Sequence, residues 1–345
     1  MKILILKPSS LGDVIQALPV LRLLRLHLPE SRIYWWIEAG LAQLLEDDPD
    51  LNGIYRFDRR RWSSPGHWGE LVSSVRAMRR EQFDYIIDLQ GLSRSAVIGW
   101  LANGETTIGL DNPREGRREG ANGFYDLRAP QSPPGTAAVD RYLSVLSFFN
   151  IPVHWQFDWL PARPAVAARL REKWKPRSGR WVLLQPGARW INKRWPVEYF
   201  VETVRQLAER AADLNFAVLG SGSDQTLTRA VVSACPERIV DLANRTSLTE
   251  MIEWIRLSDL VITNDTGPMH IAAALRKPLI AIFGPTDPAS TGPYGQPDAV
   301  FQAAYPPCIP CLKRDCRYDE PLACLHAITP EQVYRRAVER LGISG

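Results

Sequence analysis

The sequence lacks any long run of uncharged apolar residues. The first apolar run, in MKILILKPSS, is much shorter than the core of a secretory signal peptide. No later stretch reaches the roughly 18 residues that a membrane-spanning helix needs. We therefore expect a cytoplasmic protein without a transmembrane segment.

The sequence also lacks a large excess of either charge, because 42 Lys and Arg residues are nearly balanced by 38 Asp and Glu residues. The net charge is only +4. This balance argues against binding by charge alone, so no nucleic-acid partner is expected. Hydrophobic residues make up 45% of the chain, which argues against disorder. A chain of 345 residues exceeds the size at which one core usually stops growing, so we expect two domains.

Cysteine is scarce as well, and five residues in a chain this long exclude a secreted disulfide framework. Four of them have the spacing C-x2-C-x4-C-x7-C. Four thiolates could close a tetrahedral zinc site of the structural type, although the spacing matches no pair of CxxC knuckles and reduced cysteines are common in cytosolic loops. A structural zinc site and a set of free thiols therefore both stay open for Cys308, Cys311, Cys316 and Cys324.

Apolar runs of strand length alternate with segments of helical period up to about residue 150, and the alternation starts again at residue 181. This pattern is typical of doubly wound parallel α/β sheets and predicts two Rossmann-like domains that face a central cleft. We place them at 1–165 and 175–328, joined by a proline-rich linker, and expect the last helix, within 329–345, to pack back on the first domain. The expected strands are 2–6, 33–37, 54–57, 85–89, 181–184, 216–219, 238–240, 260–263 and 279–283.

The segment 103–137 is rich in Gly, Pro and Arg. A connection of this length without a clear period is more often functional than packed. We interpret it as an irregular functional loop of the first domain.

The stretch 259–284 combines a strand, a polar turn, a short Ala-rich helix and a second strand. Thr266 is placed to cap the helix and Pro268 suits its first turn, so the helix start offers free amides to an anion. Asp265 and Thr266 end a strand, at the edge where open α/β sheets bind ligands, and His270 lies in the first helical turn. Alternatively, the two polar residues only cap the helix and His270 is a packed side chain.

An acid follows the first expected strand, in the turn Ser9-Ser10-Leu11-Gly12-Asp13. A carboxylate in this position can take a proton from an attacking sugar hydroxyl. Asp13 could equally be a helix-start acid that the helix dipole stabilises, without a catalytic role.

Two loops of the second half carry further candidate donors and acceptors. Lys193 lies in WINKRWP, close to Arg189 and Arg194, and could hold a diphosphate or belong to a solvated basic loop. The segment GSGSD lets the backbone approach a nucleotide, and its Asp224 could accept hydrogen bonds from ribose hydroxyls. This is not the full dinucleotide fingerprint, because Gln225 stands where the third glycine belongs.

Arginines gather in two loops of the first half. Such clusters attract an acceptor that carries carboxylates or phosphates, or they form a solvated charged surface. The two clusters are Arg59, Arg60 and Arg61, and Arg114, Arg117 and Arg118.

Six motifs, taken in order, resemble those of the ADP-heptose:lipopolysaccharide heptosyltransferases, glycosyltransferase family 9. The resemblance runs from residue 2 to about residue 341. It implies a GT-B architecture in which the first domain binds the acceptor and the second binds the nucleotide sugar. The motifs are SSLGDVIQALPVLRLLR, FDYIIDLQGLSRSA, REGANGFYD, LQPGARWINKRWP, NDTGPMHIAAAL and AIFGPTDP.

The resemblance implies an inverting transfer of heptose from ADP-L-glycero-D-manno-heptose to the inner core of lipopolysaccharide, with Asp13 as general base. The acceptor is Kdo or the first heptose, because the RRW stretch resembles the first heptosyltransferase and the cysteine loop the second. Donor binding falls to Lys193, Asp224, Asp265, Thr266, Gly267 and His270, and acceptor binding to Ser10, Arg60, Arg61 and Arg118.

The implied partners are ADP-heptose and a lipid A-Kdo acceptor, met by an enzyme peripheral to the cytoplasmic face of the inner membrane. No metal is expected to be required, because the second half lacks a DxD carboxylate pair and cationic side chains can stabilise the departing ADP.

Two other functions use the same fold. An epimerase-like nucleotide-sugar enzyme would need further acid and base groups, which the sequence does not identify. A non-catalytic nucleotide-sugar-binding protein would not need the acid at position 13.

Overall fold

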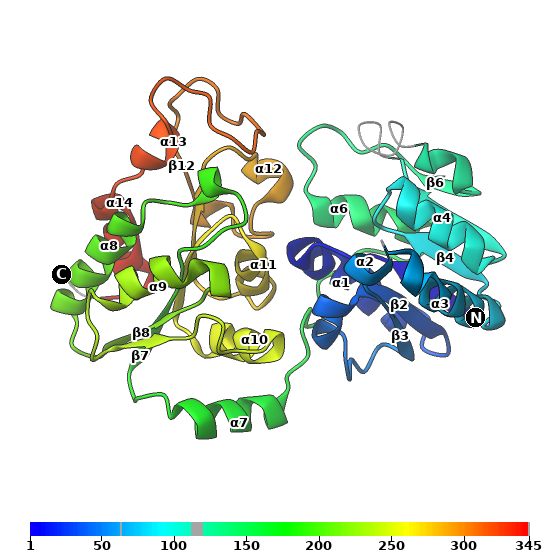
Figure 1. Cartoon of the computed structure of the whole chain (residues 1–345), viewed down its shortest axis with the longest axis horizontal. Coiled ribbons are helices and arrows are strands. Elements are labelled where there is room, and N and C mark those ends of the chain that lie inside the picture. Colours follow the sequence, from blue (N-terminus) through cyan, green and yellow to red (C-terminus); the bar gives the residue numbers. More distant parts are fainter. Residues whose placement is uncertain (63, 112–119, 344–345) are drawn as a thin grey trace. The chain divides into compact units, whose positions relative to one another are not determined.

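The computed structural model describes residues 1–62, 64–111 and 120–343. The chain divides into two compact units, Met1–Pro161 and Ala162–Gly345, which Figure 1 draws from blue to red along the sequence. Each unit has its own sheet and its own buried core, and each is described by itself.

The described part of the first unit contains a six-stranded parallel sheet with the strand order β3-β2-β1-β4-β5-β6. The central strand β1 is apolar on both faces, as expected for a strand that helices cover on both sides. The order reverses between β1 and β4, so the turns after these two strands start side by side at the carboxyl edge. The strands are β1 (Lys2–Leu6), β2 (Arg32–Glu38), β3 (Gly53–Phe57), β4 (Tyr85–Asp88), β5 (Thr106–Leu110) and β6 (Leu127–Ala129).

The helices of the first unit cover the two faces of this sheet. Helices α3 and α4 pack side by side on one face, over Leu4, Leu6 and Ile86, whereas α1 packs against α6. The helices are α1 (Leu11–His27), α2 (Arg59–Trp62), α3 (Trp68–Arg80), α4 (Ser93–Ala102) and α6 (Ala138–Leu143), with 3-10 turns η1 (Ala39–Leu44), η2 (Pro65–His67), η3 (Ala121–Phe124) and η4 (Ser144–Phe149).

The described part of the second unit repeats the arrangement, with the parallel order β12-β11-β10-β7-β8-β9. Here the order reverses between β7 and β10, so the loops that follow these strands begin next to each other. The strands are β7 (Arg180–Gln185), β8 (Leu214–Val218), β9 (Ile239–Asp241), β10 (Leu260–Asn264), β11 (Leu279–Phe283) and β12 (Val300–Gln302).

The helices of the second unit flank this sheet (Figure 1). They are α7 (Pro164–Trp174), α8 (Val197–Arg210), α9 (Gln225–Val232), α10 (Leu248–Leu257), α11 (Gly267–Ala274), α12 (Pro288–Thr291), α13 (Ala323–His326) and α14 (Pro330–Arg340), with 3-10 turns η5 (Ile191–Lys193), η6 (Gly222–Asp224) and η7 (Pro297–Ala299).

The doubly wound α/β prediction is confirmed, but two details differ from it. The segment 103–137 is not wholly irregular, because it supplies β5 and β6. The sequence hides β5 because it is short and contains Gly109, where a side chain would collide with the buried ring of Tyr125.

The last helix also differs from the expectation that it packs back on the first domain. Helix α14 packs against α8 and β11, and Val333 and Ala337 are fully buried in the core of the second unit. The Arg180 guanidinium donates to the carbonyl of Leu341, 2.9 Å away, just beyond this helix. The apolar face of α14 is therefore already covered within its own unit.

Candidate active site

The turn between β1 and α1 positions Asp13 in the first unit. The backbone amide and the hydroxyl of Ser10 both donate to Asp13 Oδ2, at 2.9 and 2.6 Å. The hydroxyl of Tyr142, from α6, donates to Asp13 Oδ1 at 3.3 Å. Asp13 therefore stabilises the helix start, which was one of its two predicted roles, and its second oxygen is oriented by Tyr142, a residue that the sequence did not suggest.

Lys7 joins this carboxylate to the neighbouring strand. It is buried at the end of β1, with Nζ 4.6 Å from the centre of the Tyr142 ring. The same ammonium donates to the carbonyl of Leu89, directly after β4, at 3.1 Å. The sequence signal for the contact of Lys7 with Leu89 was a lysine directly after a buried apolar strand. Buried lysines are rare unless they are paired, so such a lysine is expected to have a partner.

Asp88 closes β4 and organises the turn that follows it. Its carboxyl is fully buried and accepts from the amides of Gln90 and Gly91 and from the hydroxyls of Ser95 and Tyr125. Burial raises the pKa of Asp88, and the four donors act against that rise. Burial, and then the nearby carboxyl of Asp88, also raise the pKa of Tyr125.

Asn264 ties the two central loops of the second unit together. It is fully buried at the end of β10, its Oδ1 accepts from the amide of Trp195, and its Nδ2 donates to the carbonyl of Pro186 at 2.8 Å. Both partners lie in the loop after β7. This anchoring role of the first residue in the NDTG segment was not predicted.

The predicted donor residues Lys193 and Asp265 meet beside this anchor. Lys193 Nζ lies 2.6 Å from Asp265 Oδ2, which also accepts from the hydroxyl of Thr286 at 2.6 Å. The lysine comes from the loop after β7, the aspartate from the turn after β10, and the threonine from the turn after β11. The carboxyl edge of this sheet thus holds a cation that is still partly exposed, with 18% of its side chain accessible.

The start of α11 lies directly after this pair. Thr266 occupies the N-cap position in an extended conformation, but its hydroxyl contacts Thr263 and the carbonyl of Asn264 instead of capping the helix. The helix begins at Gly267; Pro268 has no amide hydrogen, and the amide of Met269 donates to the carbonyl of Thr266 at 3.1 Å. The amide of Gly267 is therefore the donor that this helix start can offer to an anion. His270 is buried in the same helix.

Asp224, predicted to contact ribose, is mainly a cap in this structure. Its Oδ2 accepts from the amide and the hydroxyl of Ser221 at 2.9 and 2.7 Å, and its Oδ1 faces Arg194 at 3.4 Å. A side chain at Gly187 would collide with this carboxyl, so the loop after β7 passes very close to it. The contact with ribose stays a prediction.

The predicted acceptor residues are placed less completely. Arg61 forms an ion pair with Glu70, which connects α2 to the first turn of α3. Arg60 lies in α2, and Arg114, Arg117 and Arg118 fall outside the described residues.

The four clustered cysteines line one pocket of about 90 Å³ in the second unit. Their segment rests on the lysine loop, because Asn192 Nδ2 donates to the carbonyl of Lys313 at 2.7 Å and Arg314 stacks over Trp190. Burial, and then the charges of the other cysteines, raise the pKa of Cys324. Across the described residues no three His, Cys, Asp or Glu side chains are grouped to hold a metal ion, and the zinc site stays a prediction from spacing.

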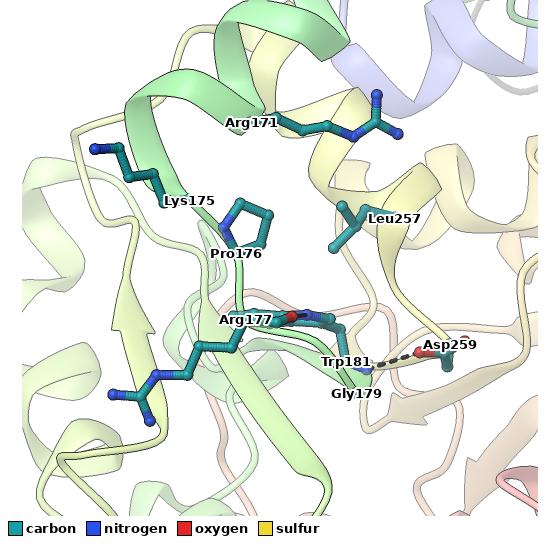
Figure 2. A pocket seen from close by; sticks show the side chains of 8 residues that line it. All are labelled: Arg171, Lys175, Pro176, Arg177, Gly179, Trp181, Leu257 and Asp259. Carbon is teal, nitrogen blue, oxygen red and sulfur yellow. Dashed lines mark hydrogen bonds between the residues drawn. The ribbon is translucent and has the colours of Figure 1, made fainter.

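A larger pocket of about 550 Å³ lies at the opposite, amino edge of the second sheet (Figure 2). The amide of Trp181 donates to Asp259 there, at 2.7 Å. The side chains of Arg171, Lys175 and Arg177 diverge in Figure 2 and do not converge on a common point. This pocket therefore lacks the arrangement of a phosphate site.

Two doubly wound units in one chain, each with polar residues at the carboxyl edge of its sheet, form the fold of the GT-B class. The model of glycosyltransferase family 9 (heptosyltransferase) matches residues 71–321. The chain belongs to this family. Among the described helices there is no candidate for a membrane span.

Named relatives agree with this assignment. Lipopolysaccharide heptosyltransferase 1 of Pseudomonas aeruginosa is 31% identical over 92% of this chain and 88% of its own length. Lipooligosaccharide heptosyltransferase 2 of Haemophilus influenzae is 29% identical over 99% of both chains.

Solved structures share the fold. The E. coli heptosyltransferase WaaC with ADP superimposes with a TM-score of 0.78 at 24% identity, over 99% of this chain and 100% of that one. The same enzyme with ADP-2-deoxy-2-fluoro heptose gives 0.77 at 24% identity, over 98% and 99%.

We predict that the stability of the first unit depends on the ionisation of Asp88. Because its pKa is raised in the folded state, the folded chain keeps this proton above the ordinary carboxyl value of 3.8, where the unfolded chain has lost it. The free energy of unfolding should therefore fall as pH rises from about 4, and Asp88→Asn should remove that part of the decline.

Urea unfolding followed by tryptophan fluorescence at pH 5 and pH 8 measures this effect. Tyr125→Phe is the matched variant, because it removes one donor to Asp88 and should steepen the decline. Parallel pH dependences for the wild type and Asp88→Asn would contradict the prediction.

Proposed function

We propose that this enzyme transfers heptose from ADP-L-glycero-D-manno-heptose to Kdo or to the first heptose of the lipopolysaccharide inner core. The observation that carries the proposal is the contact of Lys193 with Asp265 at the start of α11, which suits the diphosphate of a nucleotide sugar. Support comes from the lipopolysaccharide heptosyltransferase 1 relative and from the ADP-bound form of the E. coli enzyme.

On the donor side, Lys193 is the cation that receives the diphosphate. Its ammonium is already oriented by Asp265 and by the Trp190 ring, whose centre is 4.9 Å away. The amide of Gly267, at the start of α11, adds a donor that needs no rearrangement, and preorganised donors stabilise the charge that develops on a departing ADP. Thr266, Gly267, His270 and Asp224 complete the proposed donor site, the last through ribose.

On the acceptor side, Asp13 is the proposed general base. Its carboxylate takes the proton of the acceptor hydroxyl while that oxygen forms a bond to the anomeric carbon of heptose. The bond from the anomeric carbon to the diphosphate oxygen breaks on the opposite face, so the configuration inverts and ADP leaves. Ser10, Arg60, Arg61 and Arg118 are the proposed acceptor contacts, and the enzyme works at the cytoplasmic face of the inner membrane.

The acceptor is identified by supplying purified protein with ADP-heptose and either a heptose-free or a one-heptose inner core. A mass increase of one heptose on the heptose-free core supports the first addition, and an increase only on the one-heptose core supports the second. Failure with both acceptors would overturn the proposed substrate.

Asp13→Asn should reduce turnover by roughly 10² to 10⁴, as expected for the loss of a general base. The amide oxygen of asparagine can still accept from Ser10, so the helix start should persist and ADP affinity should stay close to that of the wild type. Turnover is measured at saturating donor, and affinity by calorimetry with ADP. Unchanged turnover would reduce Asp13 to a helix-start acid.

Lys193→Met should weaken ADP binding by about 10- to 100-fold, the range expected for a lost charge-assisted hydrogen bond. The double variant Lys193→Met, Asp265→Asn separates two explanations. If Lys193 binds phosphate itself, ADP binding stays weak in the double variant. If the lysine only neutralises Asp265, the double variant recovers, which would contradict the proposal. Lys173→Met, which removes the distant pair with Glu250, is the control.

Transfer should persist after treatment with a chelator, because the proposed cations are side chains. Activity measured before and after EDTA, with metal analysis of the same samples, tests this. Loss of activity that returns only with added divalent metal would show that the side chains do not suffice. Zinc that copurifies and disappears in a Cys308→Ser, Cys311→Ser variant would support the structural site at the cysteines.

A further inference from the structure

The outer surface of helices α3 and α4 carries large apolar side chains that the described part of the chain leaves largely exposed, Trp100 with its ring against Phe124. Trp68 and Trp100 are 57% and 62% exposed, and Val72 and Val97 are 43% and 36% exposed. Tryptophan is rarely left this open on a soluble surface without a partner. We call this surface, with the exposed Arg76, Arg79, Arg80 and Arg94 of the same two helices, the α3–α4 face.

These side chains belong to one side of the unit. Both helices pack on the same face of the first sheet, with Leu71, Val75 and Met78 of α3 and Ile98 of α4 turned towards the strands. In α3 the exposed positions 68, 72, 76 and 79 follow the spacing i, i+4, i+8 and i+11, which keeps them on one stripe of the helix. The exposed groups of α3 therefore form one stripe, and α4 with its own exposed groups packs beside that helix on the same face of the sheet.

The arginines of the α3–α4 face outnumber the acids on the same two helices. The two helices contain four arginines and a single acid, Glu70, which already pairs with Arg61. Among the described residues, none of the four guanidinium groups forms an ion pair or a side-chain hydrogen bond. A face with free cations around exposed tryptophans suits a partner that is anionic at its surface and apolar just below it.

We infer that the α3–α4 face is a docking surface for a bilayer with anionic headgroups. Tryptophan prefers the boundary between headgroups and acyl chains, and each nearby arginine adds attraction to anionic lipid. A second copy of this chain is a poorer occupant, because two such faces would bring eight arginines together.

Docking to a bilayer rests on the proposed function and extends it, because the proposed lipid-linked acceptor lies in such a bilayer. Arg61, one of the proposed acceptor contacts, holds α2 against the first turn of α3 through Glu70. The exposed Trp68 begins that turn. Docking through this face would thus place the RRW segment close to the lipid surface.

Sedimentation with vesicles tests the inference without any sugar. The full chain should bind vesicles of phosphatidylglycerol and phosphatidylethanolamine, bind phosphatidylcholine vesicles poorly, and lose affinity as salt is raised. Trp68→Ser, Trp100→Ser should weaken binding on the order of tenfold. Arg76→Ser, Arg79→Ser should weaken it by about fivefold per arginine at low salt.

The matched controls remove exposed groups elsewhere. Val153→Ser, Leu312→Ser removes two apolar side chains that are 51% and 56% exposed, and Arg335→Ser removes an exposed arginine of α14. Both should bind vesicles like the wild type. Thermal unfolding confirms that the variants fold, as expected for substitutions of exposed residues.

Equal vesicle binding by the wild type and the tryptophan variant would overturn the inference. The inference would also be overturned if the wild type formed a dimer in sedimentation velocity and did not bind vesicles, and if the tryptophan variant were a monomer. Transfer to a delipidated inner-core oligosaccharide reports on the proposed function separately. The tryptophan variant should keep this activity. If the wild type does not transfer heptose to the delipidated oligosaccharide, the proposed substrate is overturned, whereas the vesicle result still stands by itself.

Discussion

The second unit depends on one buried carboxylate. Asp265 is 7% exposed, and it holds Lys193 and Thr286 at the same oxygen. A buried charge is costly unless it is paired and hydrogen-bonded, so this carboxylate is stable only while three separate loops stay in register. The loops after β7, β10 and β11 are therefore fixed relative to one another before any ligand arrives.

This constraint explains why the lysine can be useful. An ammonium on a long flexible side chain would lose considerable rotamer freedom when it binds a phosphate. Here Asp265 and the ring of Trp190 have already ordered it, and 18% of its surface remains open. Asn264 stabilises the same arrangement, because it hydrogen-bonds to Pro186 and Trp195, at the two ends of the loop that carries Lys193.

The first unit uses a related device at its own carboxyl edge. Asp88 takes four hydrogen bonds and fixes the turn after β4, whose Leu89 carbonyl receives the buried ammonium of Lys7. Lys7 in turn packs on Tyr142, which donates to Asp13. A structural acid thus orients the surroundings of the acid proposed to be catalytic, and the two carboxyl groups differ in burial.

The sequence predicted what depends on neighbours along the chain. The long apolar strands and the helix starts at Asp13 and at Thr266 are local patterns, and most of them lie where they were expected. Lys193 and Asp265 were expected at one donor site, but other partners far apart in the chain were not predictable. Tyr142 is 129 positions from Asp13, and Asn264 is 69 from Trp195, so no spacing rule connects them. The strand β5 was not predicted for a similar reason, because only the ring of Tyr125, which packs against it, explains its Gly109.

The same distinction separates capping from binding at Asp224 and Asp13. Both are third residues of a helical start, and each accepts from the serine three positions earlier, Ser10 or Ser221, so their local structures are alike. The fold then treats them differently. Asp224 is buried beneath the backbone of Gly187 and its second oxygen faces the guanidinium of Arg194, whereas the second oxygen of Asp13 meets a phenol from another helix. A carboxylate that another element orients, and that is not covered by its neighbours, is the better candidate for proton transfer, and this is the physical ground for preferring Asp13 as the base.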